Sequence, residues 1–246
     1  MDELLLFAAV GFAAQLVDGA LGMAYGITAT TVLLSMGVMP AIASASVHAA
    51  EVFTTGVSGV AHWRFGNIDR ELFWQLALPG MIGGATGALL VATLPGDQIR
   101  PLVSLYLLAM GVVILRRALR ARTGVDRNRM PTPLLGLFGG FLDASGGGGW
   151  GPMVASTLLS NGTTPRYAIG TVSAAEFFVT SVVSATFVMT IGLELWPIIA
   201  GLILGGALAA PFAAYATQKL PDRPLMILVA MVVILLGARN LLQLLP

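Results

Sequence analysis

Long runs of apolar residues, separated by charged residues, proline and glycine, follow one another along the whole chain. Each run approaches the roughly 20 apolar residues that a helix needs to cross a bilayer. A segment in lipid has to satisfy its own backbone hydrogen bonds, so every run is predicted to be helical. The predicted segments are 4–36, 41–62, 72–93, 98–118, 134–160, 166–189, 195–217 and 223–245.

Composition agrees with this pattern. Of the 246 residues, 57% are hydrophobic and 10% are charged, whereas soluble domains carry about 25% charged residues. We therefore predict an all-α, polytopic protein that forms one membrane domain over residues 1–246, with the lipid bilayer around it. A net charge of +1 indicates no nucleic-acid surface. The chain has no cysteine, which excludes disulfides and thiol-ligated metals, and neither a metal nor another cofactor is predicted.

The chain contains an internal repeat with an offset of 125 residues. The stretch DGALGMAYGITATTVLLSMGVMPAIASASVHAAEVFTT, from Asp18, aligns with DASGGGGWGPMVASTLLSNGTTPRYAIGTVSAAEFFVT, from Asp143. Polar and helix-breaking residues match, which chance similarity between apolar stretches does not explain. The matched pairs include Asp18/Asp143, Gly22/Gly147, Gly26/Gly151, Gly37/Gly162, Pro40/Pro165 and Glu51/Glu176. We predict two four-segment repeats, one near 4–120 and one near 133–246, with a linker near 121–132.

The first segment of each repeat decides whether the halves run parallel or inverted. Residues 4–36 would span about 50 Å as one straight helix, which is too long for one crossing and too short for two. A broken, re-entrant segment followed by three crossings would invert the second half. With this topology, eleven of the 13 basic residues share one side with the linker 116–130, which is then cytoplasmic. Single-crossing first segments would place nine there, so the inverted arrangement is favoured.

The same first segments carry the candidate substrate site. A helix that stops inside the membrane exposes backbone N–H groups with about half a positive charge, which attract anions. The glycine-rich breaks at 19–22 and 146–149 are therefore predicted to bind an anion, one from each half, although small residues also serve tight helix packing. Packing is the preferred reading of the glycines at 80–90 and 201–211. The candidate substrate-binding residues are Gly19, Gly22, Tyr25, His48, Ser145, Gly146, Gly147, Gly148, Gly149, Trp150 and Ser173.

Four carboxyl groups are expected within the membrane. Glu51 and Glu176 lie mid-segment, where a charge costs about 2.5–3.5 kcal/mol on insertion scales. Burial favours the neutral carboxyl group unless a cation arrives, so a proton-coupled cycle is a hypothesis. Asp18 and Asp143 either belong to this polar centre or cap the second half-helix, bonding amides two or three residues onward. His48 either donates to an anion or forms an ordinary hydrogen bond between helices.

These motifs resemble those of the TauE/SafE family of sulfite exporter-like membrane permeases. The resemblance lies in DASGGGGWGPMVASTLL with TPRYAIGTVSAAEFFVT, and in DGALGMAYGITATTVLL with ASASVHAAEVFTTGVSG. It implies a carrier in the cytoplasmic (inner) membrane for small sulfur-containing or organic anions, of the sulfite, sulfonate or thiosulfate class, and no enzyme. The alternatives are an anion channel and an intramembrane hydrolase with Ser145 as nucleophile and His48 as base. Exact substrate, direction, coupling ion and oligomeric state are not determined by the sequence.

Overall fold

The structure, a computed structural model, describes residues 2–21, 23–119, 130–192, 196–219 and 222–243. These residues form helices and no strand, which confirms the predicted all-α fold. The predicted segments coincide with helices or helix pairs, whose ends differ from the predicted ones by only a few residues. The helices are α1 (Asp2–Leu21), α2 (Tyr25–Ser35), α3 (Pro40–Arg64), α4 (Arg70–Thr93), α5 (Gly96–Leu119), α6 (Thr132–Gly146), the π-helix η1 (Gly151–Ala155), α7 (Ser156–Ser160), α8 (Pro165–Ile191), α9 (Trp196–Lys219) and α10 (Asp222–Leu242).

The membrane character of the chain is visible in these helices. Among the described residues, α4, α5 and α8 are long and apolar enough to cross a membrane, judged by length and composition.

The turns that precede α3 and α8 are alike in the two halves. Gly37 and Gly162 adopt positive φ angles of 89° and 87°, and proline then occupies the first position of both α3 and α8. Proline suits that position because an N–H group there would have no acceptor within the helix, so its absence costs no hydrogen bond.

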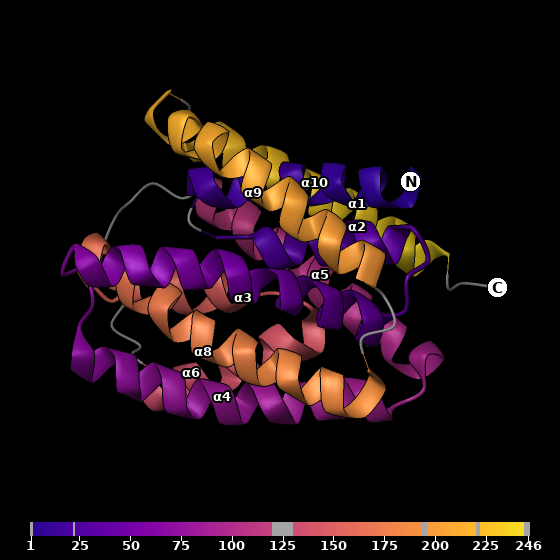
Figure 1. The fold of residues 1–246 in the computed structure, drawn as a ribbon, viewed down its shortest axis with the longest axis horizontal. Helices are drawn as coiled ribbons and strands as arrows, with labels where there is room; N and C mark the ends of the chain where they lie inside the picture. The colour runs from indigo at the N-terminus through magenta and orange to yellow at the C-terminus, as the bar shows by residue number, and fades with distance from the viewer. Residues whose placement is uncertain (1, 22, 120–129, 193–195, 220–221, 244–246) are drawn as a thin grey trace.

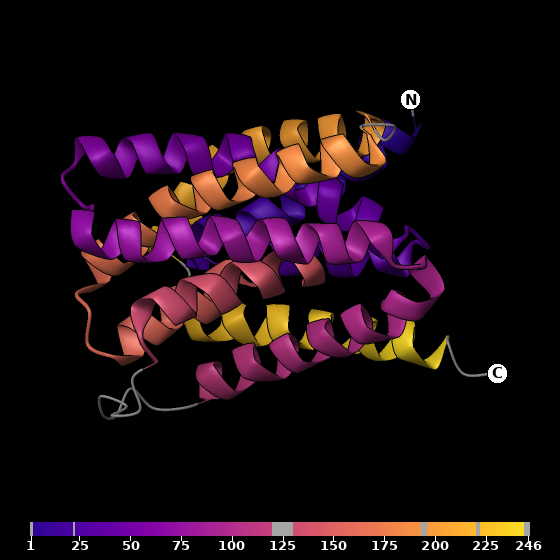
Figure 2. The same cartoon turned by 90° about the horizontal axis from the view of Figure 1, so that it is seen from below.

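Both predicted first segments are interrupted, and each returns toward the end from which it started. The start of α1 and the end of α2 lie at the right in Figure 1, whereas α6 starts and α7 ends at the left. Figure 2, which views the molecule from below, shows the same placement of these helix ends along the long axis. The first interruption falls later than predicted, because α1 continues through Gly19 to Leu21. Gly22 lies outside the described residues.

Equivalent helices of the two halves pack antiparallel to each other. In the α3/α8 pair, Gly59 faces Ala174 and Gly56 faces Phe177, so the residue numbers run in opposite directions. The α5/α10 pair behaves in the same way, since Gly111 faces Ile234 and Leu108 faces Gly237. The two halves therefore present corresponding helices in opposite orientations.

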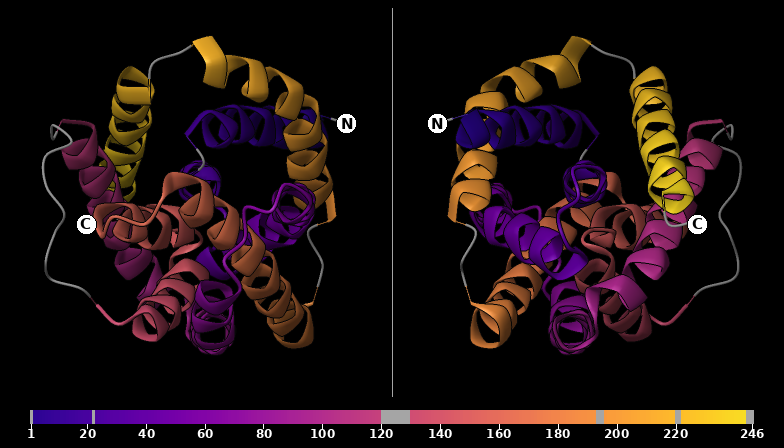
Figure 3. Two further views of the ribbon diagram at one scale, coloured as in Figure 1. Left: turned by 90° about the vertical axis from the view of Figure 1, so that its left-hand side faces the viewer. Right: turned by 90° about the vertical axis from the view of Figure 1, so that its right-hand side faces the viewer.

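The first helix of each half packs on a helix of the other half. Helix α1 lies along α9, and α6 lies along α4; α1 is steeply tilted and appears lengthwise in the end-on views of Figure 3. A Cβ built on Gly205 would lie 1.9 Å from the carbonyl oxygen of Ala8, and one on Gly83 would lie 2.0 Å from that of Leu137. The glycine-rich stretches at 80–90 and 201–211 thus allow close helix packing, as predicted.

Candidate functional site

The two helix breaks carry equivalent aspartate hydrogen bonds. Asp18 Oδ1 accepts from the Tyr25 amide at 3.2 Å, and Asp143 Oδ1 accepts from the Trp150 amide at 2.9 Å. The aspartates therefore cap the start of the returning helix, but seven residues onward rather than the two or three predicted. The reason is geometric: each aspartate still belongs to the incoming helix, and the chain turns back before the next helix begins.

The glycines of the second break are mostly packed against protein. A Cβ on Gly146 would lie 2.0 Å from the Tyr106 ring, and one on Gly148 would lie 2.3 Å from the backbone between Gly26 and Ile27. The Tyr106 hydroxyl donates to the Gly148 carbonyl at 2.9 Å. The two breaks therefore cross in direct backbone contact, which only glycine allows at this spacing.

Between the two breaks lies a cavity of about 260 Å³. This volume is below the range of about 300–1,000 Å³ typical of drug-sized ligands, so it suits a small solute. Its lining includes four carboxyl groups, two from each half, together with hydroxyl and amide side chains, and no lysine or arginine among the described residues. The polar lining residues are Gln15, Asp18, Tyr25, Glu51, Thr54, Thr55, Ser58, His62, Asp143, Ser173 and Glu176, and Gly26, Gly149, Gly151 and Pro152 bring backbone to it.

Some of the other residues that were predicted to bind substrate line the cavity, and others do not. Tyr25 lines the cavity and donates its hydroxyl hydrogen bond to the Leu202 carbonyl at 3.3 Å. Trp150 is fully buried, and its indole N–H donates to the Val172 carbonyl at 3.2 Å, so it fills space beside the cavity. Ser145 donates to Leu142 on its own helix. Among the four glycines 146–149, Gly149 is the one in the cavity lining.

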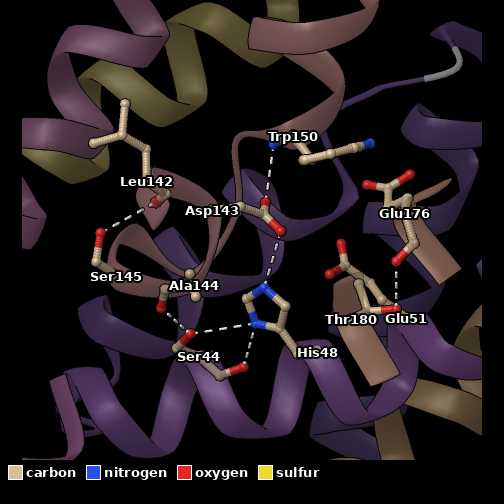
Figure 4. A network of polar contacts seen from close by, with 12 residues as sticks. Ser44, His48, Glu51, Leu142, Asp143, Ala144, Ser145, Trp150, Glu176 and Thr180 are labelled. Atoms are coloured by element: carbon tan, nitrogen blue, oxygen red, sulfur yellow. Dashed lines mark hydrogen bonds and ion pairs between the residues drawn. The ribbon is translucent and has the colours of Figure 1, made fainter. Parts of the chain in front are cut away.

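His48 is fully buried and forms a pair with Asp143 (Figure 4). Its Nδ1 faces the Ser44 carbonyl at 2.8 Å, an acceptor, so Nδ1 carries a hydrogen. Its Nε2 lies 3.1 Å from Asp143 Oδ2. The imidazole and the carboxyl group therefore form a buried contact that joins α3 to α6.

Glu51 has a buried carboxyl oxygen without a hydrogen-bond partner among the described residues. Its side chain is 5% exposed and lies beside Gly26, the second residue of α2. Oε1 lies on that side, 2.9 Å from where a Gly26 Cβ would be. Oε2 is buried and has no hydrogen-bond partner in the described part of the chain. Glu176, the equivalent residue, lines the same cavity and is partly exposed to it.

Several cavity residues were not singled out from the sequence. Gln15 precedes Asp18 by three positions, which places both on one face of α1, and that spacing was an available signal. Gly26 and Gly151 form a matched pair in the repeat to which the sequence assigned no role. Thr54, Ser58 and Pro152 carry no signal in the sequence that distinguishes them from other small polar residues or prolines.

The geometry offers no support for hydrolysis. The Ser145 hydroxyl donates to the Leu142 carbonyl at 3.5 Å, while His48 is held by Ser44 and Asp143. The nucleophile and base that the hydrolase alternative requires are therefore engaged with different partners.

Comparison with known proteins identifies the family. Residues 7–240 match the family model described as sulfite exporter TauE/SafE. The chain is similar to the probable membrane transporter protein YtnM of Bacillus subtilis (strain 168), with 44% identity over 252 residues that cover 99% of this chain and 84% of the relative. No solved structure matches the chain. The protein is a multi-pass membrane transporter, not an enzyme, and belongs to the TauE/SafE family.

Proposed function

We propose that this protein is a secondary carrier of small sulfur-containing or organic anions of the sulfite, sulfonate or thiosulfate class. The observation that carries the proposal is the small polar cavity at the meeting point of the two helix breaks, lined by matched residues of both halves. Transporters built from internal repeats commonly bind their substrate between the repeats, where helices are discontinuous.

Alternating access between two inverted repeats is the proposed mechanism. Its support is the antiparallel packing of α3 against α8 and of α5 against α10, together with the opposite directions of the two broken segments. The cavity extends toward the end of α3, where Ser58 and His62 line it. Helix α1 packs on α9 of the second half, and α6 packs on α4 of the first half. A movement of one repeat relative to the other would therefore change the shape of both breaks together.

The proposed location is the cytoplasmic membrane, with the linker in the cytoplasm. Helix α3 ends, and α4 and α8 begin, at the end of the molecule where α5 finishes (Figures 1 and 2). Arg64, Arg70, Arg116, Arg117 and Arg166 belong to these helix ends. Positive residues favour the cytoplasmic side, so the cavity extends toward the cytoplasm.

Recognition in this cavity depends on hydrogen-bond donors rather than on basic side chains. Ser58 and Ser173 bring hydroxyl groups to it, and backbone amides at the helix breaks add positive potential. Four carboxyl groups face the same space, so an anion enters favourably only when protons accompany it. This arrangement supports the proposal that transport is coupled to protons.

Flux measurements in proteoliposomes test the proposal. Thiosulfate, sulfite, methanesulfonate and acetate are each offered with and without an imposed proton gradient. Saturable flux of the sulfur anions that responds to the gradient is expected. Unitary currents without saturation would instead indicate the anion channel, and uptake of none of these anions would contradict the substrate class.

A further inference from the structure

We infer that Val179, Val183 and Phe187 of α8 form the closed outer gate of the transport pathway, and that this gate opens into a second cavity at the other end of the molecule. The inference rests on the proposed alternating access and assigns it to residues of one helix. Its basis is a difference between the two halves, because the helix face that lines an open cavity on α3 is packed shut on α8.

Equivalent faces of α3 and α8 have opposite surroundings. Three polar residues of α3, spaced four positions apart, line the cavity between the two breaks, and they are Thr54, Ser58 and His62. The residues 125 positions later in the chain are Val179, Val183 and Phe187, and their exposed fractions are 0%, 0% and 1%. When two inverted repeats exchange conformations, the face that lines the pathway in one half lines it in the other half. The α8 face is therefore the one that opens in the opposite state.

Tight packing keeps the α8 face closed. A Cβ built on Gly80 of α4 would lie 2.9 Å from Cγ2 of Val179, and Phe187 belongs to the same buried apolar cluster as Val179. Helix α9, the counterpart of α4, leaves more room, since a Cβ on Gly206 would lie 3.8 Å from Cγ2 of Thr54. Apolar side chains in close contact exclude water and ions, so they seal the pathway on the α8 side.

A second cavity of about 330 Å³ lies beyond this cluster. Ile191, one turn after Phe187 on α8, lines it, as do Ala45 of α3 and Ala92 of α4. These three residues also belong to, or pack against, the cluster that buries Phe187. The cavity lies where α3 and α5 begin and where α4 and α8 end, at the right in Figure 1. This end is opposite to the cytoplasmic one in the proposed orientation, so we call the second cavity the outer cavity.

The layer between the two cavities is thin. The antiparallel register of α3 and α8 places Phe187 level with Ser46, which lines the outer cavity. Glu51, five residues further along α3, lines the cavity between the breaks. Five residues of helix rise about 7.5 Å, and the buried contact of His48 with Asp143 lies within this distance. A small movement of α8 away from α4 is therefore enough to join the outer cavity to the polar centre.

Cysteine labelling tests the gate, because the chain contains no cysteine of its own. Single-cysteine variants are exposed to a membrane-impermeant maleimide in right-side-out and in inside-out membrane vesicles. Val183→Cys is expected to react from the outside, and Ser58→Cys, its equivalent on α3, from the inside. Val233→Cys is the matched control, since this valine of α10 is fully buried and lies outside the proposed pathway. Val183→Cys should react at least about tenfold faster than the control, because it is exposed in a populated state of the transport cycle.

A further variant tests the apolar nature of the gate. Phe187→His, which copies His62 at the equivalent position, leaves less apolar surface to expose when the gate opens. It is expected to raise the outer labelling rate of Val183→Cys by about tenfold and to leave that of Val233→Cys unchanged. An equal rise at both positions would mean a general loosening of the fold and would contradict the gate. Phe187→Cys is the alternative reporter if Val183→Cys does not fold.

The outcomes separate the gate from the proposed substrate class. Labelling of Val183→Cys and Phe187→Cys no faster than that of Val233→Cys would overturn the inference. Labelling of Val183→Cys and Ser58→Cys from the same side would overturn it as well. The labelling needs no substrate, so absence of thiosulfate flux together with labelling from opposite sides would contradict the substrate class and support the gate.

Discussion

The two helix breaks have the same position in the repeat but different chemistry. At the second break, Asp143 is paired with His48, and Gly147, Gly148 and Gly149 all adopt positive φ angles. At the first break, Asp18 has no histidine, because the residue equivalent to His48 is Ser173, and the positive φ of 100° falls on Ala24. The second break is thus tightly packed around a buried His48–Asp143 pair, whereas Asp18 at the first break has no basic partner among the described residues. The repeat places the two breaks at equivalent positions, and different residues at a few of these positions give each break different surroundings.

Removing the two aspartates gives the largest expected difference between the breaks. Asp143→Ala removes both a helix cap and the partner of a fully buried histidine, so we expect it to lower the free energy of unfolding by about 3 kcal/mol. Asp18→Ala removes only a cap, and a loss of about 1 kcal/mol is expected. Denaturant unfolding in detergent measures both. Equal losses would contradict the claim that the breaks differ electrostatically.

Adding a side-chain atom where the two breaks touch is expected to have the second-largest effect. Gly148→Ala adds a Cβ 2.3 Å from the backbone of α2 at a φ of +141°, so overlap and strain together should cost about 2–3 kcal/mol and reduce transport. Gly37→Ala is the control, because its φ is +89° and nothing lies within 4 Å. We expect it to cost about 1 kcal/mol with transport unchanged. Comparable transport by both variants would show that the contact between the breaks is dispensable.

Relieving the backbone at Ala24 gives the smallest effect. A non-glycine residue at φ 100° is strained, so Ala24→Gly should raise the free energy of unfolding by about 0.5–1 kcal/mol. Its equivalent in the second half is already Gly149. A shift of the denaturant midpoint to higher concentration is expected. A lower midpoint would mean that the neighbouring contacts favour alanine more than the backbone disfavours it.

Much of the architecture was available from the sequence, because it depends on local patterns. The lengths of the apolar runs predicted the helices, and Pro40 and Pro165 marked two of their starts. The offset of 125 residues brings Asp18 into correspondence with Asp143, and Glu51 with Glu176, from the order of the amino acids alone. All four of these carboxyl groups line the cavity. Repetition made them visible, since matched polar residues stand out against an apolar background.

The environment of each residue was decided only by the tertiary structure. Glycine-rich breaks predicted exposed amides, yet Gly148 packs against Gly26, 122 positions away in the chain, and the Trp150 amide is taken by Asp143. The pairing of His48 with Asp143 joins residues 95 positions apart. Local pattern predicts which bonds a backbone makes with itself, because those partners are a few residues away. The partner that faces a helix end depends on how distant helices cross, and that is set by packing of the whole molecule.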